Sequence, residues 1–468
     1  MSWDLVVIGA GPAGVAAALQ GAALGLKTLL LDQRPTSGGQ IYRGAERPDG
    51  VLGDDPHYAR GPVLAERLKH SPVVHWPATR VWQLAGDGEI GLSRHGQARL
   101  IHGRQVIVAS GAQERPFPIP GWTLPGVMTA GAAQILLKES DVAAPGAVFA
   151  GCGPLLYLVA HQYLQLGIPV AAVLDTTPTA NYLRALPELF RALGAARYLA
   201  RGLKYLAHIK RHTRHITGVT ALRAEGQDRL EAVSYRRGNG GWVTLATEQL
   251  FLHQGVIPQV NLALAAGCEA TWDEGQLGWR PVVDAWGTTS QGAIAVAGDA
   301  GAIGGAVAAE LKGELAALGA AVRLGRLGEA EAEARARPKQ KALAADLRIR
   351  PFLETLYRPS KGFRIPADDD TIVCRCEELT AKAINAAIAT GAPGPNQLKS
   401  FCRCGMGPCQ GRQCGVTVCE MIAAQRGCSV AEVGYFRLRP PVVPLGLEEL
   451  AHLTTEDAAP EAAPEAAP

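Results

Sequence analysis

Apolar runs and small-residue segments alternate at the start of the chain and predict strands and helices in a fixed order. Asp4 to Ile8 is a short apolar run that predicts a buried β-strand. Pro12 to Leu24 is rich in alanine and predicts a helix, and Lys27 to Leu31 predicts a second buried strand. The pattern therefore predicts a strand–turn–helix–strand unit of a parallel α/β sheet.

The same alternation returns twice further along the chain. Ala147 to Ala150 predicts a strand, Leu155 to Leu166 a helix, and Pro169 to Leu174 a strand that ends at Asp175. A third segment, Ala293 to Gly313, predicts a strand, a Gly-Asp turn and an Ala-rich helix. This order indicates that one α/β domain is interrupted by the other.

Charge and hydropathy exclude some classes of function. The 468 residues include 46 Lys and Arg against 43 Asp and Glu, and the net charge of +3 gives no support for a nucleic-acid partner. The first apolar run lacks a preceding basic segment, and no run reaches the roughly 18 apolar residues of a membrane helix. We expect a cytoplasmic protein that meets a membrane only through its partners.

The first glycine turn has the pattern of a dinucleotide site. Residues 9–14 read Gly-Ala-Gly-Pro-Ala-Gly and fit G-x-G-x-x-G. Gly9 permits the tight turn, Gly11 lets the backbone approach a pyrophosphate, and Gly14 allows close packing of helix on strand. Asp32 closes the second strand, where a carboxylate would bind an adenosine ribose. The alternative is a glycine-rich turn in an ordinary α/β protein.

Two later segments favour FAD over NAD. Val106 to Gly111 and Ala293 to Asp299 resemble the second and third FAD motifs of the two-dinucleotide-binding flavoprotein disulfide-reductase superfamily. That resemblance implies that Asp299 binds the ribityl chain and that the helix start near Gly305 faces the flavin pyrimidine; the alternative is a solvated turn aspartate. The superfamily's redox-active cysteine pair is missing before Cys152, which argues against a dithiol mechanism.

The residues expected at the FAD site lie in these motifs, in the loop after the ribose carboxylate, or on a neighbouring strand. They are Gly9, Gly11, Pro12, Ala13, Gly14, Asp32, Gln33, Arg34, Gly39, Gln40, Arg43, Val81, Ala109, Gly111, Gly298, Asp299, Gly305 and Ala306.

The second glycine turn is degenerate. Residues 151–156 read Gly-Cys-Gly-Pro-Leu-Leu, and Leu156 in the third glycine place should push the helix away from the strand. One interpretation is a site for NAD or ATP, and the other is a retained fold without efficient nicotinamide chemistry. The residues of this candidate site are Gly151, Gly153, Pro154, Leu155 and Asp175.

Cysteines cluster near the end of the chain. Eight of the ten lie between Cys374 and Cys428, which favours metal ligation in a cytosolic protein. Cys374, Cys376, Cys409 and Cys414 form C-x-C and C-x4-C pairs, and we expect each pair to bind one iron of a [2Fe-2S] cluster. Zinc is the alternative metal, although it prefers pairs two to four residues apart.

The other cysteines of this segment have open roles. Cys402 and Cys404 lie just before the third ligand, where they either exchange with a ligand or simply pack. Core packing is the default expectation for the remaining two, Cys419 and Cys428.

The two cysteine motifs resemble a known ferredoxin type. Residues 373–377 read Val-Cys-Arg-Cys-Glu and residues 405–414 read Gly-Met-Gly-Pro-Cys-Gln-Gly-Arg-Gln-Cys, as in the bacterioferritin-associated-ferredoxin-like [2Fe-2S] domain. Together with the flavin motifs, the chain from Asp4 to Leu450 resembles the FAD-containing α subunits of multisubunit dye-linked dehydrogenases. That group includes the opine oxidase A subunit, the hydrogen cyanide synthase B subunit and the D-hydroxyproline dehydrogenase α subunit.

This resemblance implies a glutathione-reductase-like α/β flavoprotein with two dinucleotide-binding domains and a small helical [2Fe-2S] domain. The expected domains are a discontinuous FAD-binding domain (1–118 and 256–325), a second nucleotide-binding-like domain (119–255), a connector (326–369), the [2Fe-2S] domain with a C-terminal extension (370–450) and a disordered tail (451–468).

The resemblance also implies cofactors and partners. The cofactors are FAD, a [2Fe-2S] cluster, a second nucleotide at the degenerate turn, and FMN at a subunit interface. The partners are a catalytic FAD-containing β subunit that oxidises a secondary amine or amino acid of the D-hydroxyproline, opine or proline type, a small ferredoxin-like γ subunit, and an electron acceptor such as a quinone. This chain would relay electrons, because FAD takes two at once and the cluster passes one at a time.

Two other functions stay open. The chain could be a self-contained NAD(P)H reductase that uses the cluster toward an external acceptor, although Leu156 counts against it. The cluster domain could also be a docking or iron-sensing module. The sequence shows no convincing acid/base dyad, and His161 is expected to pack or to face solvent.

Overall fold

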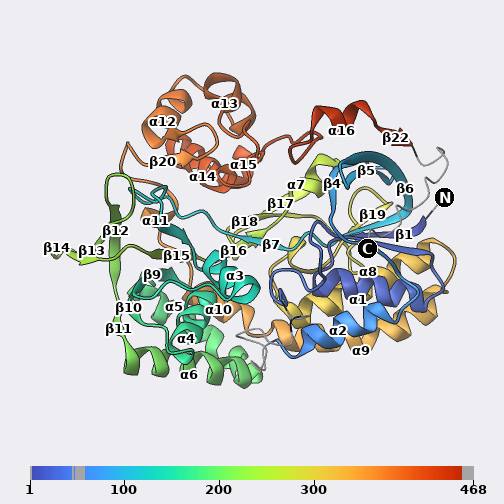
Figure 1. The fold of residues 1–468 in the computed structure, drawn as a ribbon, viewed down its shortest axis with the longest axis horizontal. Helices are drawn as coiled ribbons and strands as arrows, with labels where there is room; N and C mark the ends of the chain where they lie inside the picture. Colours follow the sequence, from blue (N-terminus) through green and yellow to red (C-terminus); the bar gives the residue numbers. More distant parts are fainter. Residues whose placement is uncertain (1–2, 45–46, 48–57, 456–468) are drawn as a thin grey trace, which may run out of the picture.

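A computed structural model describes residues 3–44, 47 and 58–455. Figure 1 shows two α/β domains side by side, with a helical C-terminal domain on the side of the sheets opposite to their main helical layers. The predicted two-domain α/β fold with a small helical domain is confirmed.

The first domain is built on a sheet with the order β3-β2-β1-β6, in which these strands are parallel and β19 pairs with the far side of β6. The long strand β6 continues into an antiparallel extension with β5 and β4. The strands are β1 (Trp3–Ile8), β2 (Thr28–Leu31), β3 (Val74–Trp76), β4 (Thr79–Leu84), β5 (Glu89–Arg94), β6 (Gln97–Val108) and β19 (Ile294–Val296).

One helical layer covers this sheet. Small residues on the facing sides of α1 and α8 let these two helices pack closely. Gly313 on α8 lies on Ala13 of α1, where a Cβ at Gly313 would be 2.1 Å from the Ala13 carbonyl oxygen. The layer contains α1 (Pro12–Ala23), α2 (Arg60–Lys69), α8 (Ala306–Arg323) and α9 (Glu329–Leu347). This packing brings the third sequence motif onto the first.

The second domain repeats the parallel arrangement with the order β11-β10-β9-β15-β8. Its strands are β8 (Val127–Thr129), β9 (Ala147–Cys152), β10 (Val170–Asp175), β11 (Arg214–Ile216) and β15 (Leu250–Gln254). Helices α3 (Ala130–Ser140), α4 (Pro154–Gln165) and α6 (Ala196–His212) pack on one face. The other face packs against the antiparallel strands β12 (Val219–Glu225), β13 (Ala232–Arg237) and β14 (Trp242–Ala246).

The chain crosses between the two domains on a pair of short strands. It leaves the first domain through β7 (Ala112–Glu114) and returns through β16 (Val256–Pro258), and the two strands pair antiparallel. The second domain therefore interrupts the first along the chain, and the predicted domain boundaries stay a prediction.

The C-terminal domain packs a cysteine-rich core between short helices. The connector ends in α10 (Arg350–Leu356) and α11 (Lys361–Arg364). The domain then contains β20 (Ile372–Cys374), β21 (Leu379–Thr380), α12 (Ala381–Ala389), α13 (Pro395–Cys402), α14 (Gly415–Arg426) and α15 (Val430–Val433).

The start of the predicted disordered tail is ordered. Helix α16 runs from Leu447 to Ala451, and β22 (Thr454–Thr455) pairs with β6, so backbone pairing holds residues 451–455 on the first domain. The rest of that prediction, 456–468, lies outside the described residues. Among the described helices, none is both long and apolar enough to span a membrane.

Candidate functional site

The first glycine turn lies at the carboxyl edge of the parallel strands of the first sheet. Gly9 has φ +107°, and a Cβ there would lie 2.4 Å from the Ala109 carbonyl oxygen at the end of β6. A Cβ at Gly14 would lie 1.7 Å from the Gly9 carbonyl oxygen. Only glycine fits these two positions, so α1 begins directly against the end of β1.

A second glycine loop covers this turn. The Gly38 N–H donates to the Ala10 carbonyl oxygen at 2.8 Å. Gly39 has φ +62°, and a Cβ there would lie 2.7 Å from Gly11 Cα. Two stretches of bare backbone therefore face each other at the N-terminus of α1, which is the kind of cradle that a pyrophosphate needs.

Asp32 is at the end of β2, as predicted, and it is half-buried. Its carboxylate accepts hydrogen bonds from the Ala10 N–H at 2.5 Å and from the Arg34 N–H at 2.7 Å. These bonds hold the carboxylate beside the glycine turn, in the position where a ribose hydroxyl would meet it.

Two arginines place positive charge beside this turn. The Arg34 and Arg43 guanidinium groups lie 3.5 Å and 3.4 Å from the Glu139 carboxylate of α3. Burial lowers the pKa of Arg43, and the charge of Arg34 lowers it further. The guanidinium groups of Arg34 and Arg43 thus lie among the Asp32 and Glu139 carboxylates beside the glycine turn, where they could meet the phosphates of a ligand.

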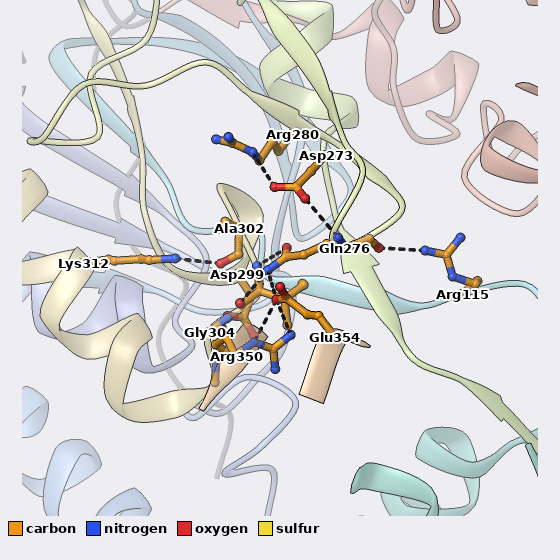
Figure 2. Close-up of polar contacts among 12 residues, drawn as sticks. Arg115, Asp273, Gln276, Arg280, Asp299, Ala302, Gly304, Lys312, Arg350 and Glu354 are labelled. Atoms are coloured by element: carbon orange, nitrogen blue, oxygen red, sulfur yellow. Dashed lines mark hydrogen bonds and ion pairs between the residues drawn. The ribbon is translucent and has the colours of Figure 1, made fainter. Parts of the chain in front are cut away.

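Figure 2 shows the loop that carries Asp299. Asp299 Oδ1 accepts from the Gly304 N–H at 2.7 Å and from the Gly305 N–H at 3.1 Å. Lys312, nearly two turns into α8, donates from Nζ to the Ala302 carbonyl oxygen at 2.7 Å. Burial lowers the pKa of Lys312. These bonds hold the loop in place just before α8, which begins at Ala306 after the cap residue Gly305.

Gln276 ties the same loop to the connector. Its side-chain amide accepts from the Ile303 N–H at 2.9 Å and donates to Glu354 Oε1 at 2.8 Å. Arg115, which is fully buried, donates to the Gln276 carbonyl oxygen at 2.9 Å. The sequence did not predict a role for Arg115, Gln276 or Glu354, because none of them lies in a recognisable motif.

The remaining predicted FAD residues lie along the same edge or just behind it. Gly298 has φ +71° in the 3₁₀ turn η2 (Gly298–Ala300), and a Cβ there would lie 2.7 Å from Ala13 Cβ. Gln33 and Gln40 are exposed, and Val81 lies in β4 against the core of the first domain. Helix α1 begins at Pro12 and helix α8 at Ala306. Ala109 and Gly111 follow the end of β6. The bare cradle, the carboxylates and the local positive charge fit an FAD, and each residue's role stays a prediction.

The second glycine turn has the right backbone for a nucleotide. Gly151 has φ +138°, and Gly153, with φ +118°, precedes α4. Leu156 is fully buried in the core beneath α4, where the first domain has a glycine. Pro154 and Leu155 form the first helical positions.

The Asp175 carboxylate is buried and already has hydrogen-bond partners within the protein. It is 1% exposed, its Oδ1 accepts from the Thr177 N–H at 2.8 Å, and its Oδ2 lies 3.4 Å from His215 Nε2. Burial opposes its ionisation, but hydrogen bonds from His215, Thr177 and Tyr157 outweigh burial and hold the pKa of Asp175 below its usual value. A ribose could reach this carboxylate only by displacing those partners.

The connector also covers the second turn. Cys152 Sγ donates to the Tyr357 carbonyl oxygen at 3.4 Å. Asn181, in α5 (Thr179–Ala192), donates to the carbonyl oxygens of Leu356 at 3.1 Å and Arg358 at 2.9 Å. Residues 356–358 thus lie across the ends of β9 and β10. The residues as arranged do not fit a dinucleotide, so binding of NAD or ATP here stays an unsupported prediction.

The cysteine site combines two groups of thiols. The Sγ atoms of Cys374, Cys404 and Cys414 lie within 4.8 Å of one another, and all three residues are buried. Cys376, which is exposed, lies near Cys409, whose pKa is raised by burial first and also by Cys376. The described thiols place Cys374 near Cys404 and Cys414, and which thiols share an iron stays a prediction.

Backbone donors and glycines surround these thiols. N–H groups of Gly405 and Glu377 donate to the Cys374 sulfur. Hydrogen bonds from Cys404 and Cys414 hold the pKa of Cys374 far below its ordinary value. A Cβ at Gly407 would lie 2.3 Å from Cys376 Cβ, so the loop approaches the thiol as bare backbone. Clustered cysteines with N–H donors beside them fit an iron–sulfur cluster, whose ligands are thiolates.

Three other cysteines have main-chain or hydroxyl partners. Cys402 donates to the Leu398 carbonyl oxygen at 3.4 Å, and Cys419 to that of Gly434 at 3.2 Å. Cys268 donates to Thr289 Oγ1 at 3.3 Å. These contacts are typical of packing.

Two side chains of the first domain hold the cysteine loop. Gln113 Nε2 in β7 donates to the Arg412 carbonyl oxygen at 2.6 Å. Asn261 Nδ2, at the start of α7 (Asn261–Ala265), donates to the Gln410 carbonyl oxygen at 3.0 Å. A small cavity between the domains is lined by both side chains and by Trp279, Val416 and Tyr435. The loop between two predicted ligands therefore contacts the first domain directly.

One buried acid–base pair escaped the sequence analysis, which found no such dyad. His253 Nδ1 lies 2.6 Å from Glu114 Oε1, and the other carboxylate oxygen accepts from the Gly131 N–H at 2.8 Å. His253 is 2% exposed, so the pair joins β15, β7 and α3 rather than meeting a substrate. His161, as expected, is buried, with Nδ1 2.7 Å from His208 Nδ1.

Comparison with protein families identifies both halves of the chain. The model for pyridine nucleotide-disulphide oxidoreductases matches residues 3–313, and the sarcosine oxidase A3 domain matches residues 369–453. The A subunit of opine oxidase from Agrobacterium tumefaciens is 44% identical over 466 residues, which cover 96% of this chain and 92% of that protein. Hydrogen cyanide synthase subunit HcnB of Pseudomonas protegens is 32% identical, covering 95% of this chain and 97% of that protein.

Solved structures share the fold. L-proline dehydrogenase from P. horikoshii superposes with a TM-score of 0.72 at 20% identity, covering 96% of this chain and 79% of that one. Thioredoxin reductase from T. acidophilum has a TM-score of 0.51 at 19% identity and covers 69% of this chain and 99% of that one. These likenesses are to the fold alone.

Proposed function

Because the chain belongs to the pyridine nucleotide-disulphide oxidoreductase family and to the group of opine oxidase A subunits, we propose that it is an electron-relay subunit. It is an oxidoreductase and a flavoprotein subunit of an amine or amino-acid oxidase type. The proposal adds that it holds FAD in the first domain and a [2Fe-2S] cluster at Cys374, Cys376, Cys409 and Cys414.

The contact between the two candidate sites carries this proposal. Strand β7 begins at Ala112, directly after Gly111 at the flavin edge, and Gln113 on β7 binds the Arg412 carbonyl oxygen. Arg412 lies between Cys409 and Cys414. One short strand and one hydrogen bond thus join the end of β6 to the cysteine loop. FAD accepts electrons in pairs and a [2Fe-2S] cluster carries one at a time, so the two groups together connect both kinds of transfer.

The protein's own residues bind and orient the groups in this scheme. Asp32, Arg34 and Arg43 would hold the adenosine and phosphates, and Asp299 would hold the ribityl chain. Gln113 and Asn261 would fix the distance between flavin edge and thiols. The domain boundaries set out above go with this scheme as part of the proposal.

The finer partners also belong to the proposal. Relatives named as subunits support a companion β subunit with its own FAD, which would oxidise a secondary amine or amino acid of the opine, proline or D-hydroxyproline type. A small γ subunit, FMN at a subunit interface and a quinone acceptor complete the proposed complex, with the chain itself in the cytoplasm.

The arrangement of the second domain counts against the NAD(P)H reductase alternative. Asp175 has internal partners, and residues 356–358 cover the glycine turn. A nicotinamide nucleotide would have to displace the connector before it could approach the flavin domain.

The test uses the purified full chain. Flavin, iron and sulfide are measured per chain, the flavin is reduced by light under anaerobic conditions, and the EPR signal of the reduced cluster is followed. We expect about one FAD, two irons and two sulfides, and an EPR signal that appears as the flavin is reoxidised. Rapid bleaching of the flavin by NADH, or a reduced flavin that never generates the signal, would contradict the relay.

A further inference from the structure

A fifth thiol lies inside the cysteine site. Cys374, Cys404 and Cys414 form one group, and Cys404 Sγ is 3.9 Å from Cys414 Sγ. Cys376 and Cys409 form the other group. A [2Fe-2S] cluster binds four cysteine thiolates, two on each iron. The site therefore brings together one thiol more than the proposed cluster uses.

The geometry of the buried group suits ligation. Two thiolates bound at about 2.3 Å to one tetrahedral metal ion lie about 3.8 Å apart. The Cys404–Cys414 separation of 3.9 Å matches that spacing, and Cys374 lies within 4.8 Å of both. Any two of the three could therefore serve as one pair of cluster ligands, and Cys376 and Cys409 would supply the other pair.

The surroundings of Cys404 differ from those of the packing cysteines. Cys402 and Cys419 donate to main-chain carbonyl oxygens, whereas Cys404 has thiols as its neighbours. Arg403, which precedes it, has φ +64° and ends α13 in the left-handed conformation. The Phe436 ring closes the space above Gly405 on its other side. The left-handed turn at Arg403 and the Phe436 ring thus flank Cys404, whose thiol lies beside those of Cys374 and Cys414.

We propose that Cys404 is a resident alternate ligand that takes the place of either of its two neighbouring thiols, Cys414 or Cys374, when that thiol is lost or released; the exchange with Cys414 illustrates the step. The inference rests on the [2Fe-2S] cluster proposed above. The exchange is redox-neutral: the Cys404 thiol gives up its proton to solvent as its sulfur binds iron, and the released Cys414 thiolate takes one up. Neither iron changes its oxidation state, and the cluster keeps four thiolates throughout.

The test compares four variants of the full chain: C414A, C404A, the double variant C404A/C414A, and C419A as a matched control. Cys419 is as buried as Cys414 and lies five residues further along the chain, in α14, but its partner is the Gly434 carbonyl oxygen. Iron, sulfide and FAD are measured per chain, and EPR spectra are recorded after reduction by dithionite.

We expect C404A and C419A to keep the wild-type iron, sulfide and EPR spectrum. C414A keeps about two irons and two sulfides, but with shifted g values, because one ligand has changed. The double variant loses the cluster and keeps its FAD. An empty C414A that retains its FAD, beside a loaded wild type, overturns the inference.

Two further outcomes separate the possible failures. If C414A also loses its FAD and so has not folded, C374A decides, because it leaves Cys404 and Cys414 as one pair of ligands; a loaded C374A supports the inference and an empty one overturns it. A wild-type chain with zinc, or with no iron and sulfide, overturns the cluster itself and this inference with it.

Discussion

The side-chain amide of Gln113 donates a 2.6 Å hydrogen bond to the main-chain carbonyl of Arg412, across 299 residues of sequence. We expect Q113A to slow transfer from reduced flavin to cluster severalfold, because the cysteine loop is then no longer held against β7. FAD and iron content should stay at wild-type levels, since neither candidate ligand set includes Gln113. Stopped-flow absorbance of the photoreduced chain measures the rate.

A matched control for this prediction is Q97A. Gln97 is exposed at the start of β6 and does not contact the cysteine loop. Loss of one neutral hydrogen bond changes the free energy of unfolding by about 1 kcal/mol, so Q113A should remain folded. Equal rates in Q113A, Q97A and the wild type would show that this contact does not position the cluster.

Gly39→Ala should abolish FAD retention. The position has φ +62°, and the added methyl group would lie 2.7 Å from Gly11 Cα, inside the cradle. Gly25→Ala is the matched control, because Gly25 has φ +74° but open space around it. Both variants carry the conformational cost of about 1–2 kcal/mol, and only Gly39→Ala also fills the cradle. Flavin absorbance per chain after gel filtration distinguishes them; an apo G25A would show that backbone strain alone is responsible.

Asp175→Asn should destabilise the chain by about 3 kcal/mol at pH 7, because the charged carboxylate is buried among hydrogen-bond donors. The pKa of Asp175 is lowered in the folded state, so its ionisation stabilises the fold above the unfolded value of 3.8. That contribution is lost as the pH falls through the lower, folded pKa. The difference in the free energy of unfolding between wild type and D175N should therefore decrease only in that acid range.

Urea denaturation at a series of pH values measures this gap. Asp228→Asn is the control, since Asp228 is exposed in the turn before β13 and should change stability by less than about 0.5 kcal/mol. If D175N is as stable as the wild type at pH 7, the internal partners of the Asp175 carboxylate contribute no stability. In the wild type a ribose could then displace them without cost.

Asn181→Ala should release the connector from the second domain. The amide of Asn181 donates to two carbonyl oxygens on either side of Tyr357, and their loss should cost about 2 kcal/mol locally. We expect faster proteolysis near Arg358 at unchanged FAD content. The wild type should give no calorimetric signal with NADH or ATP when FAD is bound. Tight NADH binding by the wild type would refute the closed second site.

Sequence patterns were sufficient where the structure is local. The first strand was predicted at Asp4 to Ile8 and is observed from Trp3 to Ile8, and the helix from Pro12 ends one residue earlier than predicted. The glycine spacing in residues 9–14 needs only one turn of backbone, and the C-x-C spacing only a few residues. Such features follow from steric rules that act between near neighbours in the chain.

Contacts between distant residues could not be predicted in this way. The sequence near Asp175 does not predict that His215 and Thr177 contact its carboxylate. It also does not predict that residues 356–358 cover the second glycine turn. The proximity of Cys374 to Cys404 and Cys414 likewise depends on how β20 and α14 are packed. Each of these contacts closes a long loop, which only the burial of the whole core stabilises.

The sequence by itself therefore determined the α/β class, the interrupted domain order, the family and the positions of the glycine turns and cysteine motifs. The tertiary structure alone decided that the second turn is closed, that the thiols divide into groups of three and two, and that Gln113 joins the flavin edge to the cysteine loop. The physical reason is range: backbone conformation depends on neighbouring residues, whereas a site depends on which surfaces the hydrophobic core brings together.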